Sequence, residues 1–140
     1  MSSKSNDQGR AYEFACLIEL EEAIKQHRPV SVLHNSSYSA AERAYNLLST
    51  SDKETYHISA RAMIPAIFDC EPMMIEASND ELELFIQKDE EGKKGDVRDI
   101  IVERKGIVWE IGLSIKHNHL AVKHSRFTPT TYREYIFSAA

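Results

Sequence analysis

One stretch of the chain, GDVRDIIVERKGIVWEIGLSIKHNHLAVKHSR at residues 95–126, decides the fold. In its second half, from 107 to 116, large apolar residues alternate with small or polar ones. A period of two is expected of a strand with one buried face. A shorter apolar run at 100–102 precedes it, and the pair Lys105-Gly106 supplies a turn between the two runs. This stretch therefore predicts a β-hairpin.

Polar residues that could bind a cation lie on both strands of this hairpin. Asp96 and Asp99 precede the first strand. The second strand carries three polar residues on one face, namely Glu110, Ser114 and Lys116. Folding back at the turn sets one of the two aspartates opposite residues 112–114, where directly opposed Cβ atoms are about 5 Å apart. Carboxylate and hydroxyl oxygens at that distance can share one divalent cation. We expect Glu110 further along the same face.

These residue types suit the hydrolysis of a phosphodiester bond. Mg²⁺ held by oxygen ligands neutralises the charge that builds on the phosphorane oxygens, and it orients and acidifies the attacking water. A neighbouring lysine such as Lys116 offers a positive charge to the phosphate or to the water. The alternative is that the polar residues form only the solvated face of an amphipathic strand. For an isolated E-x-G-x-S-x-K the solvated face is the better interpretation. The residues that follow this motif favour the catalytic interpretation instead.

A dense set of hydrogen-bond donors follows the second strand: His117, Asn118, His119, Lys123, His124, Ser125 and Arg126. Such donors suit the phosphate oxygens and base edges of nucleic acid. A zinc site built from the three histidines is the alternative. Zinc sites usually take four ligands at recognisable spacings, and the sequence holds no CxxC pair, so nucleic-acid binding is favoured.

Two strings, GDVRDII and WEIGLSIKHNHLAVKHSR, together with the opening SNDQGRAYEFACL, carry a resemblance to a known family. They are similar to the core of the HaeIII-type restriction endonucleases, a branch of the PD-(D/E)xK nuclease superfamily. The resemblance implies that Asp99, or alternatively Asp96, is the metal-binding aspartate. It also implies that Lys116 is the terminal lysine of the signature.

One position departs from the signature of the superfamily. Ser114 stands where most members have an acid, so the missing carboxylate would come from Glu110 or Glu13. In many of these enzymes a glutamate on the first helix joins the metal site, and Glu13 lies at the beginning of a predicted helix. Ser114 itself would line the site.

The resemblance also implies an activity. Type II restriction endonucleases cleave double-stranded DNA at a short site with Mg²⁺, and a cognate DNA methyltransferase acts in the same system without direct contact being implied. The implied recognition sequence is a GC-rich palindrome such as GGCC, and a homodimer is compatible with the resemblance. The residues expected to contact DNA are Asn118, His119, Lys123, His124 and Arg126.

The resemblance is strong over residues 1–20 and 93–126 and ends after Arg126. Because HaeIII-type enzymes are generally longer, we expect residues 1–126 to be the N-terminal catalytic portion of the nuclease domain. Residues 127–140 are then a divergent or truncated tail, or a short substitute strand. One alternative is an inactive truncated remnant that binds nucleic acid or a protein. Another is a repair nuclease of the same superfamily without sequence preference.

Composition predicts a single cytoplasmic domain. A chain of 140 residues that is 42% hydrophobic can bury one core. The sequence has no apolar run of the roughly 20 residues that cross a membrane, and its N-terminus lacks the apolar region of a signal peptide. Cys16 and Cys70 stand in apolar patterns and are expected to be reduced core residues.

The net charge of −5 is unusual for a DNA-binding protein, but the charge is segregated along the chain. Residues 69–91 hold nine acids against Lys88 alone, whereas residues 93–126 hold eight bases against four acids. The candidate site is therefore locally basic, which is compatible with binding a polyanion.

The remaining sequence predicts the scaffold. Three helices are expected, at 8–27, at 40–48 with Ser39 as N-cap, and from 51 past 66 with Ser51 or Asp52 as N-cap. Alternating apolar residues at 82–86 predict a strand, and a final short helix is expected at 119–124. The predicted class is α/β (α+β), with a restriction-endonuclease-like core. In it, a mainly antiparallel mixed sheet is flanked by helices and is incomplete at its C-terminus.

Overall fold

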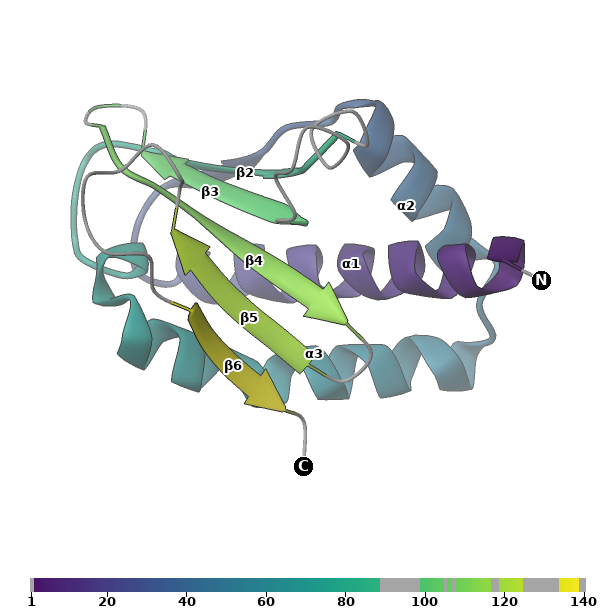
Figure 1. The fold of residues 1–140 in the computed structure, drawn as a ribbon. Coiled ribbons are helices and arrows are strands. Elements are labelled where there is room, and N and C mark those ends of the chain that lie inside the picture. Colours follow the sequence, from purple (N-terminus) through teal and green to yellow (C-terminus); the bar gives the residue numbers. More distant parts are fainter. Residues whose placement is uncertain are drawn as a thin grey trace.

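The architecture comes from a computed structural model of the 140-residue chain. The structure describes the backbone of residues 2–88, 99–104, 106, 108–116, 119–124 and 134–138, and the side chains of residues 7–88, 99–104, 106 and 108–115. Helices occupy the first half of the chain and strands the second half, with one short strand among the helices (Figure 1).

Three α-helices and one short 3₁₀-helix form the helical layer, namely α1 (Ser2–Lys25), α2 (Ser36–Asn46), α3 (Thr50–Cys70) and η1 (Pro72–Met74). The predicted helices are confirmed, but all three start earlier than expected. The N-caps are Asn35 for α2 and Ser49 for α3, rather than Ser39 and Ser51 or Asp52. Each observed cap is extended and accepts a backbone N–H three residues later, which a residue inside the helix cannot do. Pro65 lies inside α3 without ending it.

The described strands form one six-stranded sheet in sequential order. Its members are β1 (Val30–Val32), β2 (Leu82–Ile86), β3 (Ile100–Arg104), β4 (Glu110–Lys116), β5 (His119–His124) and β6 (Glu134–Ser138). β1 runs parallel to β2, and every other neighbouring pair is antiparallel. The predicted class, a mainly antiparallel mixed sheet flanked by helices, is confirmed.

The C-terminal strands correct one expectation. Residues 119–124 form strand β5 and not the predicted short helix. The segment pairs with β4 on one side and with β6 on the other, so its backbone hydrogen bonds are made within a sheet. β6 lies within residues 127–140, for which a substitute strand was one expectation.

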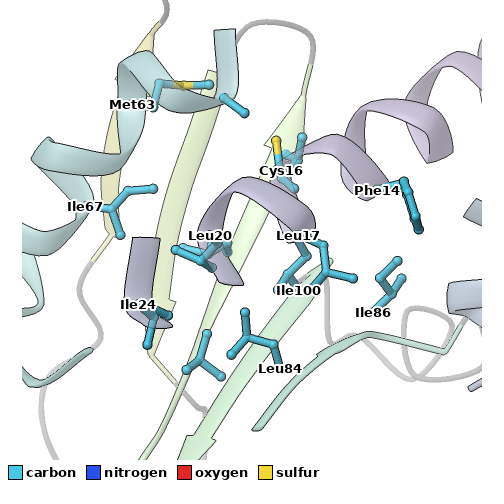
Figure 2. Close-up of a cluster of buried hydrophobic side chains, with 14 of the residues drawn as sticks. Phe14, Cys16, Leu17, Leu20, Ile24, Met63, Ile67, Leu84, Ile86 and Ile100 are labelled. Atoms are coloured by element: carbon cyan, nitrogen blue, oxygen red, sulfur yellow. The ribbon is translucent and has the colours of Figure 1, made fainter. Parts of the chain in front are cut away.

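Helix α1 packs along one face of the sheet and contacts both α2 and α3 (Figure 1). Its apolar side chains form the centre of a core shared with the sheet and α3 (Figure 2). The labelled members are Phe14, Cys16, Leu17, Leu20, Ile24, Met63, Ile67, Leu84, Ile86 and Ile100. Burying one leucine or isoleucine contributes about 1.5–3 kcal/mol, so this layer fixes α1 against the sheet.

Two further expectations concern the cysteines and the membrane. Cys16 and Cys70 are both free thiols, Cys16 in the core and Cys70 half-buried. None of the helices in the described part of the chain is both long and apolar enough to cross a membrane.

A buried ionic network closes the turn end of the β3–β4 hairpin. Asp80 accepts hydrogen bonds from Arg28 Nη2 and Arg104 Nη2, each at 2.9 Å, and from Ser78. The side chains of Arg28 and Arg104 are 0% and 8% exposed, and that of Asp80 is 20% exposed. Arg28 also donates to the Met73 carbonyl at 2.9 Å. The network ties the ends of α1 and β3 to the loop before β2.

Candidate active site

Asp99 lies directly before β3, at the open end of the hairpin. Its N–H donates to the Leu113 carbonyl at 2.8 Å, and its carbonyl accepts from the Gln87 N–H at 2.8 Å. The antiparallel register of β3 and β4 ends at the pair of Ile100 with Leu113, and Asp99 donates to the same Leu113. The structure therefore sets Asp99 within the stretch of β4 that the sequence predicted to lie opposite it.

The Asp99 carboxylate is held against β4 by the main chain. Its Oδ2 accepts a hydrogen bond from the Ile115 N–H at 2.6 Å. A hydrogen bond to a carboxylate is stronger than one between neutral groups, so this contact fixes the side-chain orientation. The neighbouring Ser114 is only 5% exposed. The Asp99 carboxylate thus lies against the main chain of β4 at Ile115, the residue that follows the buried Ser114.

Helix α1 carries Glu13, one of the two glutamates that the sequence offered as the second carboxylate. Burial raises the pKa of the Cys16 thiol, a hydrogen bond with Tyr12 opposes that rise, and the negative charges of Glu13, Glu19 and Asp99 add to it. Glu13 is half-buried and makes further interactions of its own.

Glu110 lies at the opposite end of β4. It pairs with Glu103 in the register, beside the turn of the hairpin. Four residues of strand separate it from Ser114, which corresponds to about 13 Å of backbone. The structure thus brings Asp99 to β4 at Leu113 and Ile115 but leaves Glu110 at the far end of that strand.

The remaining predicted site residues are only partly described. In the backbone register, Lys116 pairs with His119, and Lys123 pairs with Gly112. His124 pairs with Ile111. The side chains of four of them lie outside the described residues, namely Lys116, His119, Lys123 and His124. Asp96, Asn118 and Arg126 lie outside the described residues altogether. Their roles stay predictions.

The described residues bear on the predicted Mg²⁺ site, whereas the side chains of the three histidines of the zinc alternative lie outside them. Within the described residues, no three His, Cys, Asp or Glu side chains are grouped to hold a metal. Mg²⁺ needs no such cage, because it usually keeps several waters and takes one or two carboxylates together with the phosphate of the substrate. The Asp99 carboxylate is a ligand of the type that such a cation takes.

One polar cluster was not found by sequence reasoning. The Tyr45 hydroxyl hydrogen-bonds His57 Nε2 at 2.6 Å, and His57 Nδ1 hydrogen-bonds Glu19 Oε2 at 2.7 Å. Arg61 lies 3.5 Å from the same Glu19 oxygen. The four members come from three helices, α1, α2 and α3, so no local spacing in the sequence signals the cluster. They join the helices of the layer that supports α1.

Two of three comparisons with known proteins found a match. The sequence profile described as HaeIII restriction endonuclease matches residues 9–133. The type II restriction enzyme HaeIII of Haemophilus aegyptius is 51% identical over 128 residues, which cover 91% of this chain and 40% of that enzyme. The chain thus spans less than half the length of this relative. The search of solved structures found no match. The profile match and this identity show that the chain belongs to the HaeIII restriction endonuclease family.

Proposed function

We propose that this chain carries the catalytic core of a type II restriction endonuclease. The substrate is double-stranded DNA, cleaved with Mg²⁺ at a short GC-rich site such as GGCC. Family membership supports the class of reaction. In this proposal the protein is cytoplasmic, and a cognate methyltransferase protects the same DNA site without contacting the nuclease.

The observation that carries the proposal is the position of Asp99. Its carboxylate is hydrogen-bonded to the Ile115 N–H, between the serine and the lysine of the S-x-K sequence on β4. A divalent metal site needs a carboxylate whose orientation is fixed before the substrate arrives, because misplacement of a reacting group by about 1 Å can cost about a hundredfold in rate.

Each residue has a distinct task in the proposed mechanism. Asp99 and Glu13 would hold Mg²⁺, and Ser114 would line the site. When bound, Mg²⁺ supplies positive charge for the phosphate oxygens and acidifies water. Glu13 is preferred to Glu110 as the second carboxylate, since Glu110 lies about 13 Å of strand away. Lys116 would position the phosphate or the attacking water.

The proposed DNA contacts come from the end of the chain that is richest in bases. Lys123, His119, His124, Asn118 and Arg126 would bind phosphates and base edges along and beside β5. Phosphate contacts fix the position of the protein on DNA, and only base-edge contacts read the sequence.

Cleavage of plasmid DNA by the purified chain tests the proposal. We expect discrete fragments with Mg²⁺ that disappear with EDTA and in the Lys116→Ala variant. Glu110→Gln is the matched control, because it removes a carboxylate from the same strand outside the proposed site. Intact DNA from a cooperatively folded protein would contradict the proposal. DNA binding that weakens steeply with salt, without cleavage, would instead support a binding module.

A further inference from the structure

The side chain of Asn35 makes two hydrogen bonds that point in different directions. Its Oδ1 accepts the N–H of Tyr38 at 2.8 Å and thereby caps the N-terminus of α2. Its Nδ2 donates to the carbonyl of Ile86, the last residue of β2, at 3.0 Å. One half-buried side chain therefore joins a helix to the end of a central strand.

The second of these hydrogen bonds continues the β1–β2 pairing beyond β1. The Leu33 N–H donates to the Leu84 carbonyl at 2.9 Å. In a parallel pair the next such bond lies two residues further along both chains, between residue 35 and Ile86. At that position the side-chain amide of Asn35 donates to the Ile86 carbonyl, while the backbone carbonyl of Asn35 accepts the N–H of Ser39 in α2.

The same strand end leads directly to the candidate active site. Gln87 follows Ile86, and its N–H donates to the Asp99 carbonyl at 2.8 Å. Asp99 is in turn hydrogen-bonded to Leu113 through its N–H and to Ile115 through its carboxylate. Consecutive hydrogen bonds thus connect α2, the end of β2, Asp99 and β4.

We propose that Asn35 is a positioning residue of the nuclease site, whose side-chain amide holds the end of β2 to which Asp99 is hydrogen-bonded. This inference rests on the proposed function for its catalytic consequence. The structural part of the proposal is that the Asn35 amide secures the hydrogen bonds of Gln87 and Ile115 to Asp99. This part does not depend on cleavage and is tested separately.

Two substitutions separate the two roles of the side chain. Asn35→Asp and Asn35→Ser both keep an oxygen that caps α2, but both lose the donor to Ile86. Asp adds a charge and Ser does not, so an effect shared by both variants comes from the lost donor. Ser49→Ala is the matched control. It removes the cap of α3, where the Ser49 hydroxyl accepts the Asp52 N–H at 3.0 Å on an exposed part of the surface.

The first readout is cleavage under single-turnover conditions, beside DNA affinity measured with Ca²⁺ in place of Mg²⁺. We expect both Asn35 variants to cleave about tenfold more slowly, because a small displacement of Asp99 lowers the rate of the chemical step. DNA affinity should not change, and Ser49→Ala should cleave at the parental rate. A parental cleavage rate in both Asn35 variants would overturn the proposal, as would an equal slowing in Ser49→Ala.

The second readout is amide hydrogen exchange, which does not depend on activity. Exchange of the Gln87 and Ile115 amides should be faster in both Asn35 variants and unchanged in Ser49→Ala. Parental protection of these two amides in both Asn35 variants would also overturn the proposal. If the unsubstituted chain does not cleave DNA, the proposed function fails, and the exchange result alone then decides whether Asn35 secures Asp99.

Discussion

The two ends of the β3–β4 hairpin use an aspartate in different ways. At the turn end, Asp80 lies between the guanidinium groups of Arg28 and Arg104, and all three side chains are largely buried. At the open end, Asp99 accepts a hydrogen bond from the backbone N–H of Ile115. The two guanidinium groups neutralise the Asp80 carboxylate, and the Ile115 N–H orients the Asp99 carboxylate along β4. Under the proposed function, the turn end serves stability and the open end serves chemistry.

The sharpest test of this division is a pair of isosteric substitutions. Asp99→Asn removes the proposed metal-binding charge and keeps the shape of the side chain. We expect the cleavage rate to fall about a thousandfold, the loss seen when one electrostatic group is removed from an active site, with little change in the thermal midpoint. Single-turnover cleavage and a melting curve measure both quantities. Parental cleavage by this variant would remove Asp99 from the mechanism.

The reciprocal substitution, Asp80→Asn, should change the opposite property. It leaves the buried guanidinium groups of Arg28 and Arg104 without their shared carboxylate, and an uncompensated buried charge destabilises the folded state. We expect a melting midpoint several degrees lower and a parental cleavage rate per folded molecule at low temperature. A melting midpoint equal to that of the parent would contradict the division of roles between the two ends. A cleavage rate as low as that of Asp99→Asn would contradict it as well.

Acid unfolding sharpens the same comparison. Hydrogen bonds from Arg104 and Ser78, helped by the charge of Arg28, hold the pKa of the Asp80 carboxyl below its usual value of 3.8. A lowered folded pKa means that the ionised form stabilises the folded state. That stabilisation is fully present above the usual pKa, and it is lost as the pH falls towards the lowered pKa. The stability difference between parent and Asp80→Asn should therefore shrink below about pH 4; a constant difference would contradict this assignment.

The sequence predicted the hairpin and the placement of Asp99 because their signals are local. The alternation along β4 and the turn at Lys105-Gly106 lie within one short stretch, and together they predicted that Asp96 or Asp99 lies opposite residues 112–114. In the structure Asp99 donates to the Leu113 carbonyl. The choice between Glu13 and Glu110 stayed open, since distance along a strand becomes decisive only once the register is known.

Other features depend on contacts between distant parts of the chain. Strand β5 was expected to be a helix, because its six residues are too short to show a clear period and its pairing with β4 and β6 is tertiary. Arg28 and Asp80 are 52 residues apart, so the ionic network has no sequence signature. The positions of the helix caps were missed because several serines near each helix start could serve equally well.

The smallest expected effect comes from the helical layer, where Tyr45, His57 and Glu19 join three helices. Tyr45→Phe removes the hydroxyl that lies 2.6 Å from His57 Nε2 and keeps the ring that packs against Phe14. The loss of one such hydrogen bond should lower the free energy of unfolding by about 1 kcal/mol. The cleavage rate should not change, since the cluster touches neither end of the hairpin. Denaturant unfolding beside single-turnover cleavage measures both. A lower cleavage rate for Tyr45→Phe would show that the packing of α1 on its neighbouring helices also sets the position of Glu13. The residues that control the reaction would then extend beyond the open end of the hairpin.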